Sequence, residues 1–495
     1  MRLTRSRVVS TLSIFLCAVT FAAQGVAQPQ PALQSSPVTT TTSAIPRPPE
    51  LQRDVDFWIR IYSLVTTRQG VLHDERHLGI VYATIDLPES GPGRRAAVSA
   101  ARDRIVAALR EAAEAAGNNV PPASPEAQRV LALWGGEASR SRLLDAAQNV
   151  RFQLGQADRF REGVERSGRW EVHIARTFAE LGLPPELAAL PHVESSFTPT
   201  AYSKVGASGL WQFMRSTARL YMRVDDLVDE RLDPFRSTEA AAQLLANNYR
   251  ALGSWPLAIT AYNHGTAGMR RARDAMGTDD FAVIARKYDG RAFGFASRNF
   301  FPSFLAALTI DQNPERYFGK IERAAPLRFY EIQLPSPVAM ETVERRLGLS
   351  RDTLRELNPA LRRLVWSGER RVPSGYRMRV PADAMVAAQE FAKSLGTEVV
   401  EEAPRVAARY AASVAAAEAK DVSATKDDAK AAPKAAPKEA RNDSSPTQLY
   451  SVRRGDTLSS LARRFGLSVA ELARLNDLNP GAKLRRGSRL RVPAG

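Results

Sequence analysis

The chain has 495 residues, so it is too long for one compact domain and suggests about three units. Hydrophobic residues make up 44% and charged residues 25%, an ordinary balance for a soluble globular protein with a sizeable core. The net charge of +16 indicates an anionic partner: nucleic acid, a membrane surface, or an acidic polymer such as a cell wall. A solvated basic surface that only aids solubility is the plainer alternative.

The N-terminus has the pattern of a secretory signal. Arg2, Arg5 and Arg7 precede an apolar run over residues 8–23, and Val26-Ala27-Gln28 offers small residues at a cleavage site. We therefore predict a signal peptide and a periplasmic location, with association to the outer membrane or the wall left open. Export argues against nucleic acid as the partner. No other run approaches the roughly 18 apolar residues of a spanning helix, so no transmembrane span is expected.

The only cysteine, Cys17, lies inside this signal. The mature chain would then have no cysteine, which excludes disulfides, thiolate nucleophiles and Cys-ligated metals together. The alternative is that Cys17 is lipidated, as in bacterial lipoproteins, which would give a peripheral membrane association. Leu16 before it is bulkier than such sites usually carry.

Composition divides the rest of the chain. A stretch rich in Pro, Thr, Ser and Gln cannot bury a core, whereas the Ala-rich stretches that follow it predict helices. A later stretch of Lys, Ala, Pro, Asp and Ser is typical of a linker. The fold class is expected to be mainly α (α+β). The expected order is a signal peptide (1–27), a flexible leader (28–50), a helical N-terminal region (51–170), a dense core (171–325), a first strand-flanked segment (329–381), an Ala-rich helix with linker (382–447) and a compact last module (449–495).

The dense core is expected to consist of short helices. Pro184-Pro185 opens the first, which carries apolar residues at helical spacing. A second is predicted to run from Gly209, with Gln212 pointing away from its apolar face. Asp233-Pro234 is typical of an N-cap followed by proline at the first helical position, and starts a third. The fourth runs from Pro256 to Asn263 and is closed by a glycine.

The C-terminal part contains two segments in which short strands flank helices. The last module carries ten Lys and Arg against three Asp and Glu, so it supplies +7 of the net charge. The predicted strands are residues 329–333, 376–380, 449–453 and 488–492, and the helices of the last module are 458–465 and 469–476.

Glu194 is the candidate general acid. It ends an apolar helix in the segment Leu190-Pro-His-Val-Glu194-Ser-Ser-Phe197 and precedes a second apolar, aromatic segment, Gly209–Phe213. A carboxyl group held against apolar and aromatic neighbours has its pKa raised by desolvation, so it stays protonated near neutral pH and can donate a proton. A salt-bridged structural glutamate is the alternative, but it does not account for the residues downstream.

Three motifs in fixed order resemble those of family 1 lytic transglycosylases: Glu194-Ser195-Ser196-Phe197, Gly206–Phe213 and Ala261–Gly265. The resemblance covers about residues 145–312. It implies a lysozyme-like fold and cleavage of peptidoglycan strands between N-acetylmuramic acid and N-acetylglucosamine, with no metal and no cofactor. Glu194 would protonate the leaving oxygen and then act as base on the sugar's own C6 hydroxyl, which gives a 1,6-anhydro product without water.

The same resemblance implies the substrate contacts. Ser195 and Gln212 would hydrogen-bond the sugar and hold its N-acetyl group, while Tyr262 and Asn263 would orient Glu194 and the muramoyl ring. Many relatives carry in a fourth motif a tyrosine that touches the acid. Here the matching segment is Asn299-Phe300-Phe301-Pro302, which has no hydroxyl, so Tyr262 would carry more of that role.

The last module resembles a LysM domain in Tyr450–Leu458, Leu475-Asn476, Leu478-Asn-Pro480 and Gly487–Pro493. This implies a βααβ fold that grips N-acetylglucosamine units in a shallow groove. Residues 329–381 look like a degenerate second copy that lacks the Gly-Asp-Thr turn. The groove residues implied for the last module are Gly455, Asp456, Thr457, Leu478, Asn479 and Pro480.

Other chemistries were weighed against this interpretation. A hydrolase usually needs a second carboxylate, and we interpret its nearest candidates as a solvated turn before the Asp233 cap. The segment His192-Val-Glu194 mimics part of a zinc deaminase signature but lacks the cysteines, and no metal-ligand spacing is present. Two functions stay open: a non-catalytic wall-binding protein, favoured by Phe300 and Phe301, and a muramidase that uses water. The second-carboxylate candidates are Asp225, Asp226, Asp229 and Glu230.

Overall fold

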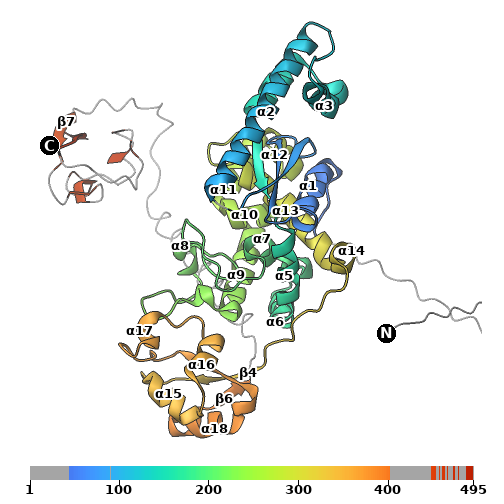
Figure 1. Ribbon diagram of the computed structural model, residues 1–495. Coiled ribbons are helices and arrows are strands. Elements are labelled where there is room, and N and C mark those ends of the chain that lie inside the picture. The colour runs from blue at the N-terminus through green and yellow to red at the C-terminus, as the bar shows by residue number, and fades with distance from the viewer. Residues whose placement is uncertain are drawn as a thin grey trace, which may run out of the picture. The chain divides into compact units, whose positions relative to one another are not determined.

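The computed structural model describes residues 44–89, 91–401 and 447–452, and beyond these only 456, 457, 460–462, 465, 472, 473, 476, 478 and 487–493. The predicted signal peptide with Cys17, most of the leader and most of the linker lie outside the described residues. The chain divides into two compact units, residues 1–413 and 414–495. The described part is mostly helical with three small sheets (Figure 1), which confirms the mainly α, α+β class.

A single hydrophobic cluster, here called the helical core, runs from Ile45 to Phe329. α13 (Phe295–Gln312) lies at its centre and packs against α1 (Gln52–Ser63), α7 (Leu190–Ser195) and α10 (Trp255–His264) (Figure 1). The boundary expected at residue 170 therefore does not separate two cores, because the apolar face of α1 is buried against α13. The remaining helices are η1 (Pro49–Leu51), α5 (Ala157–Ser167), α6 (Glu171–Glu180), η3 (Pro185–Ala189), α8 (Arg215–Ala218), η4 (Glu230–Leu232), α9 (Pro234–Leu252), α11 (Thr266–Met276), α12 (Phe281–Lys287) and α14 (Pro314–Phe318).

The end of the predicted leader is part of this core. Ile45 is only 1% exposed and belongs to the hydrophobic cluster, and Arg47 donates a hydrogen bond to the Thr309 hydroxyl of α13 at 2.7 Å. The expectation that residues 28–50 bury nothing is wrong at this end. The composition of the stretch hid one isoleucine, which is enough to anchor the chain on the helical core.

Two of the predicted helices form as their end signals indicate. The Asp233 carboxylate caps α9 by accepting hydrogen bonds from the backbone N–H groups of Phe235 and Arg236, with proline at the first helical position. Pro256 lies in the first turn of α10, and Gly265 follows its last residue. Both helices border the segments that carry the predicted motifs.

The helix predicted from Gly209 does not form. Residues 209–214 are turns, and the only helix nearby is the single turn of α8. Gly209 and Gln212 have φ angles of +84° and +47°, which no α-helix accommodates. The apolar spacing that favoured a helix instead serves a tight loop, and Leu220 on the supposed apolar face is 76% exposed.

Residues 66–155 form an N-terminal lobe, and the expectation of helices alone is wrong there. Strand β1 (Gln69–Asp74) lies between β2 (Val81–Asp86) and β3 (Val150–Leu154), antiparallel to both. The chain enters and leaves the lobe at one point, because Gln156 N–H donates to the Ile61 carbonyl and Ala157 N–H to the Val65 carbonyl, both at 2.9 Å. Its helices are α2 (Gly91–Gly117), α3 (Pro125–Trp134), η2 (Gly135–Glu137) and α4 (Arg140–Gln148).

Residues 329–401 form a second sheet-containing module. Strand β4 (Phe329–Gln333) pairs with β5 (Arg377–Pro381) around the helices that separate them, which is the βααβ order predicted for residues 329–381. The predicted Ala-rich helix belongs to this module rather than to the linker, because Phe391 and its neighbours are buried in its core. Its other elements are α15 (Met340–Leu347), α16 (Arg351–Leu357), α17 (Arg363–Trp366), η5 (Ala382–Ala384), α18 (Met385–Ser394) and β6 (Val399–Glu401), which pairs with β4.

A buried ion-pair network fixes this module on the helical core. Arg379, 3% exposed, lies over the rings of Phe235 and Phe329 and binds the carboxylates of Asp233 at 2.6 Å and Glu331 at 3.2 Å. The positive charges of Asp233's partners stand in for solvent around an otherwise desolvated carboxylate. The same Asp233 caps α9, so the helix start and the docking of the module depend on one carboxylate.

The C-terminal unit contains an antiparallel pair of strands, β7 (Thr447–Ser451) and β8 (Arg489–Pro493), close to the strands predicted at 449–453 and 488–492. Helical residues are described between them at 460–462 and 472–473. Val452, Leu461, Leu472, Leu490 and Val492 form its small apolar core. Among the helices that the structure describes in either unit, none combines the length and apolar character that a membrane crossing needs.

Candidate active site

Glu194 lies in the last turn of α7, a short helix that follows directly on η3. The side chains of Leu190 and His192 on this helix are at most 1% exposed, so α7 is wedged into the helical core. Glu194 itself is partly buried, and desolvation raises its pKa from 4.5 to about 8. The carboxyl group is therefore largely protonated at neutral pH, which is the state that a general acid needs.

The backbone beside Glu194 is strained. Among the described residues, only four that are not glycine have a positive φ angle: Asn119, Ser196, Phe197 and Gln212. Three of these four lie in the predicted motifs, and each left-handed residue costs roughly 1–2 kcal/mol. Strain of this size persists only where the surroundings fix the chain. Phe197 supplies that fixation here, because it is 1% exposed and packs against His192 and Trp170.

Ser195 joins the first motif to the second. Its hydroxyl donates to the Leu210 carbonyl at 2.7 Å and accepts a hydrogen bond from the Thr198 N–H at 3.2 Å. The hydroxyl proton is thus used within the protein, and a lone pair is left on the oxygen for any further contact. The predicted contact between Ser195 and the sugar stays a prediction.

Arg231 organises the loop of the second motif. Its guanidinium group is 1% exposed, pairs with Asp229 at 2.8 Å, and donates to the carbonyl groups of Gly206 at 2.8 Å and Phe213 at 3.1 Å. The two carbonyls stand at the two ends of the loop, so one side chain closes it. Gly209 is required inside the loop, since a Cβ atom there would lie 1.7 Å from the Arg231 carbonyl oxygen.

Gln212 and Tyr262 meet on this loop. The Gln212 amide donates to the carbonyls of Gly209 at 2.8 Å and Ala201 at 3.3 Å, while Tyr262 donates its hydroxyl to the Trp211 carbonyl at 2.8 Å. Burial and the nearby charge of Glu194 raise the pKa of Tyr262 well above its usual value. Tyr262 therefore remains a neutral donor within electrostatic range of the acid, and the second and third motifs are in contact as their order suggested.

Asn263 follows Tyr262 on α10 and is exposed. Its predicted role toward the muramoyl ring, like that of Gln212 toward the sugar, stays a prediction. The third motif ends at Gly265, where α10 stops and α11 begins.

The acidic turn proposed as a source of a second carboxylate is mostly structural. Asp229 is 1% exposed and bound by Arg231 and Arg362, so the interpretation as a solvated turn is wrong for it. Asp225 accepts hydrogen bonds from the N–H groups of Leu227 and Val228, which with Arg223 hold its pKa below the usual value against the effect of burial. Burial raises the pKa of Glu230, and Asp226 is exposed.

Tyr62 is a candidate that the sequence analysis missed, because residues 51–170 showed no chemical motif. It lies on α1, is 3% exposed, and feels the charge of Glu194. A signal was present: Leu51, Val55, Trp58 and Tyr62 recur at helical spacing, which predicts a buried face. What that face packs against could not be read from the spacing.

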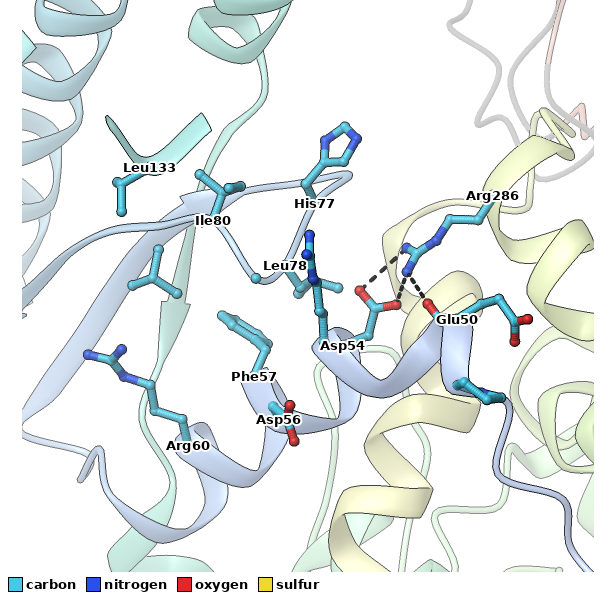
Figure 2. A pocket seen from close by; sticks show the side chains of 14 residues that line it. Glu50, Asp54, Asp56, Phe57, Arg60, His77, Leu78, Ile80, Leu133 and Arg286 are labelled. Carbon is cyan, nitrogen blue, oxygen red and sulfur yellow. Dashed lines mark hydrogen bonds and ion pairs between the residues drawn. The ribbon is translucent and has the colours of Figure 1, made fainter. Parts of the chain in front are cut away.

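In the part of the chain that the structure describes, no cluster of three or more His, Cys, Asp or Glu side chains is arranged to hold a metal ion. Outside the motifs, a cavity of about 780 Å³ lies between α1, the β1–β2 turn and α12 (Figure 2). Figure 2 shows Arg286 of α12 reaching Asp54 and the Glu50 carbonyl across one edge of it. Its lining contains none of the predicted site residues and mixes both signs of charge, so it indicates no particular ligand.

Part of the predicted LysM groove can be located in the C-terminal unit. Asp456 accepts a hydrogen bond from the Tyr450 hydroxyl at 3.0 Å, and Leu478 packs on the small apolar core. Thr457 is exposed and exchanges hydrogen bonds with Ser460, in the manner of a helix cap. Gly455, Asn479 and Pro480 lie outside the described residues.

Comparison with known proteins defines the class. The family model described as "Transglycosylase SLT domain" matches residues 174–284, and the one described as "LysM domain" matches residues 450–493. The chain therefore carries a lysozyme-like transglycosylase SLT domain and a LysM domain, as the motifs predicted. The first match contains Glu194, Gln212 and Tyr262.

Particular relatives agree with this class. The chain is 29% identical over 334 residues to membrane-bound lytic murein transglycosylase D of Escherichia coli K12, over 65% of this chain and 63% of the relative, so it spans less than two thirds of that protein. It is 39% identical over 98 residues to peptidoglycan transglycosylase gp16 of Escherichia phage T7, over 19% of this chain and 7% of the relative. A solved structure of an inactive mutant of lytic transglycosylase Slt from Pseudomonas aeruginosa matches with a TM-score of 0.25 and 18% identity, over 44% of this chain and 31% of that one.

Proposed function

We propose that this protein is a peptidoglycan lytic transglycosylase that cleaves the β-1,4 bond between N-acetylmuramic acid and N-acetylglucosamine and leaves 1,6-anhydro-N-acetylmuramic acid ends. The observation that carries the proposal is the partly buried Glu194 carboxyl with a pKa of about 8, inside the SLT match and beside Tyr262. The name of the Escherichia coli relative supports murein as the substrate.

The proposed reaction needs one titratable group. The neutral Glu194 carboxyl gives its proton to the glycosidic oxygen, and the bonding pair between muramoyl C1 and that oxygen leaves with the N-acetylglucosamine unit. The C6 hydroxyl of the muramoyl residue then bonds to C1 and returns its proton to the Glu194 carboxylate. Atoms and charge balance without water, so no second carboxylate is called for. The engagement of Asp229 by two arginines supports this reading.

The LysM domain and the basic charge support a role in holding the wall. The last module contributes +7 to the net charge, and the wall polymer is anionic. We place the protein in the periplasm, where the wall lies. This location rests on the N-terminal sequence pattern and on the cell-envelope relative.

Digestion of purified sacculi tests the proposal. Mass spectrometry of the released fragments should show anhydro ends with the wild-type protein and none with Glu194→Gln, which keeps the size of the side chain but cannot give a proton. Asp226→Asn is the matched control, because this exposed carboxylate is a rejected candidate and its loss should leave release unchanged. Reducing ends would instead identify a muramidase, and intact glycan a non-catalytic wall-binding protein.

A further inference from the structure

α13 does not supply a hydroxyl beside the acid, although its relatives' fourth motif does. Phe300 and Phe301 occupy that segment and are 6% and 0% exposed. Phe301 packs on the rings of Phe281 at 5.4 Å and Phe304 at 6.4 Å, so it serves the apolar core. The place next to Glu194 is thus open to a hydroxyl from another element.

α1 brings Tyr62 to this place through a series of packed rings. The Tyr62 ring stacks on Phe160 of α5 at 5.1 Å, and Phe160 stacks on His192 of α7 at 4.5 Å. His192 is two residues before Glu194 and is held by Asp311 of α13 at 3.1 Å. Stacked rings in a close-packed core leave little freedom to move. The position of Tyr62 relative to the helix of Glu194 is therefore fixed.

The hydroxyl end of Tyr62 lies beside Ser303, three residues after Phe300 on α13, and within electrostatic range of Glu194. Burial above all, and the charge of Glu194, raise the pKa of Tyr62. The group is consequently neutral throughout the working pH range and keeps its proton to donate. Around Glu194 the other polar groups are Tyr262 of α10, His192 with Asp311, and Arg166 of α5, which donates to the Ser196 carbonyl at 2.9 Å.

We propose that Tyr62 is a positioning residue whose hydroxyl donates a hydrogen bond to the Glu194 carboxylate after Glu194 has given up its proton, the task that relatives assign to a tyrosine of the fourth motif. As a step in catalysis this rests on the proposed function; as a contact between two side chains it does not. A hydrogen bond that is long in the free protein and tightens with charge is the usual behaviour of catalytic groups. A donor of this kind favours the carboxylate form and holds it in one orientation.

The test is a titration of Glu194 in the full chain without substrate. The protonated carboxyl is followed by its infrared C=O band, assigned by subtracting the spectrum of Glu194→Gln. Tyr62→Phe keeps the ring stack and removes the donor, so the midpoint should rise by about one pH unit. Replacing Tyr62 by 3-fluorotyrosine, a stronger donor with the same shape, should lower it. Tyr82→Phe is the matched control, since its buried hydroxyl donates to Asp74 at 3.3 Å in the N-terminal lobe and should leave the midpoint unchanged.

A midpoint that stays in place in both Tyr62 variants, or that moves equally in Tyr82→Phe, overturns the proposal. Activity on sacculi is a separate readout: Tyr62→Phe should lower kcat about tenfold with KM unchanged, and its pH profile should shift with the titration. If the wild-type protein releases no anhydro ends while the midpoint still moves, the contact stands and the proposed function fails.

Discussion

At the scale of single residues, Glu194 combines two properties that oppose each other. Burial keeps it protonated and ready to give a proton, and the same burial makes its charged form costly to the fold. In the unfolded chain its pKa returns to about 4.5. Between these two pKa values the folded protein holds a proton that the unfolded chain has lost, so stability falls as the pH rises through this window.

Replacement of Glu194 by glutamine should therefore stabilise the protein in a pH-dependent way. At pH 4 both forms of the side chain are neutral, and the free energies of unfolding should agree. At pH 9 the variant should be more stable by about 3 kcal/mol, less than the full pKa difference implies because the carboxyl is only partly buried. Urea unfolding at both pH values measures this, and an equal difference at pH 4 and 9 would contradict the assigned pKa.

Wild-type turnover should respond to the same group. A general acid with a pKa of about 8 loses its proton above that pH, so kcat should fall tenfold for each further pH unit. A flat profile up to pH 10 would show that another group protonates the leaving oxygen.

The acid was within reach of sequence reasoning, whereas its surroundings were only partly so. Three ordered motifs and an apolar context indicated Glu194, Gln212 and Tyr262, and the structure brings Tyr262 into the field of the acid. Tyr62 could not be found this way, because its relation to Glu194 depends on how α1 packs, and it lies 132 positions earlier in the chain. Contacts between distant segments leave no local periodicity.

At the scale of elements, the loop from Gly206 to Phe213 shows where periodicity misleads. Its apolar residues have helical spacing, but two positive φ angles and the Arg231 guanidinium make it a closed loop. Capping signals were more reliable, since Asp233 and Gly265 bound α9 and α10 as predicted. A cap specifies a local hydrogen bond, whereas spacing only specifies a face.

The two glycines of that loop separate backbone strain from collision. Both have positive φ angles, but a Cβ at Gly206 meets nothing within 4 Å, while one at Gly209 meets the Arg231 carbonyl. Gly206→Ala should therefore cost about 1–2 kcal/mol. Gly209→Ala should cost more than about 3 kcal/mol and reduce activity, because Arg231 must move. Thermal unfolding of the pair checks this, and equal losses would show that the loop yields freely.

At the scale of the whole molecule, catalysis and wall binding are assigned to different units of the chain. The SLT match ends at residue 284, and the LysM match begins at residue 450 in the second compact unit. The intervening βααβ module is instead docked on the helical core through Arg379 and Asp233. Its sequence likeness to LysM predicted the strand order but not this docking, which buries charges that a free module would expose to water.

Removal of residues 449–495 should separate the two activities. Pelleting with purified sacculi should retain much less of the shortened protein, while cleavage of short soluble glycans should persist at the wild-type rate, since Glu194 and its neighbours are untouched. The full chain carrying Glu194→Gln is the complementary control, as it should bind and not cut. Unchanged pelleting after the deletion would refute the binding role of the LysM domain.

The N-terminal lobe leaves the helical core and returns to it at a single junction, tied by hydrogen bonds from Gln156 and Ala157 to Ile61 and Val65. Whatever happens far out on this excursion leaves α1 and α5 in register with each other. The tip between α2 and α3, residues 118–124, is thus a natural port for a fluorescent tag or an affinity handle. A label inserted there would report on the enzyme at the wall without displacing the ring stack behind its acid.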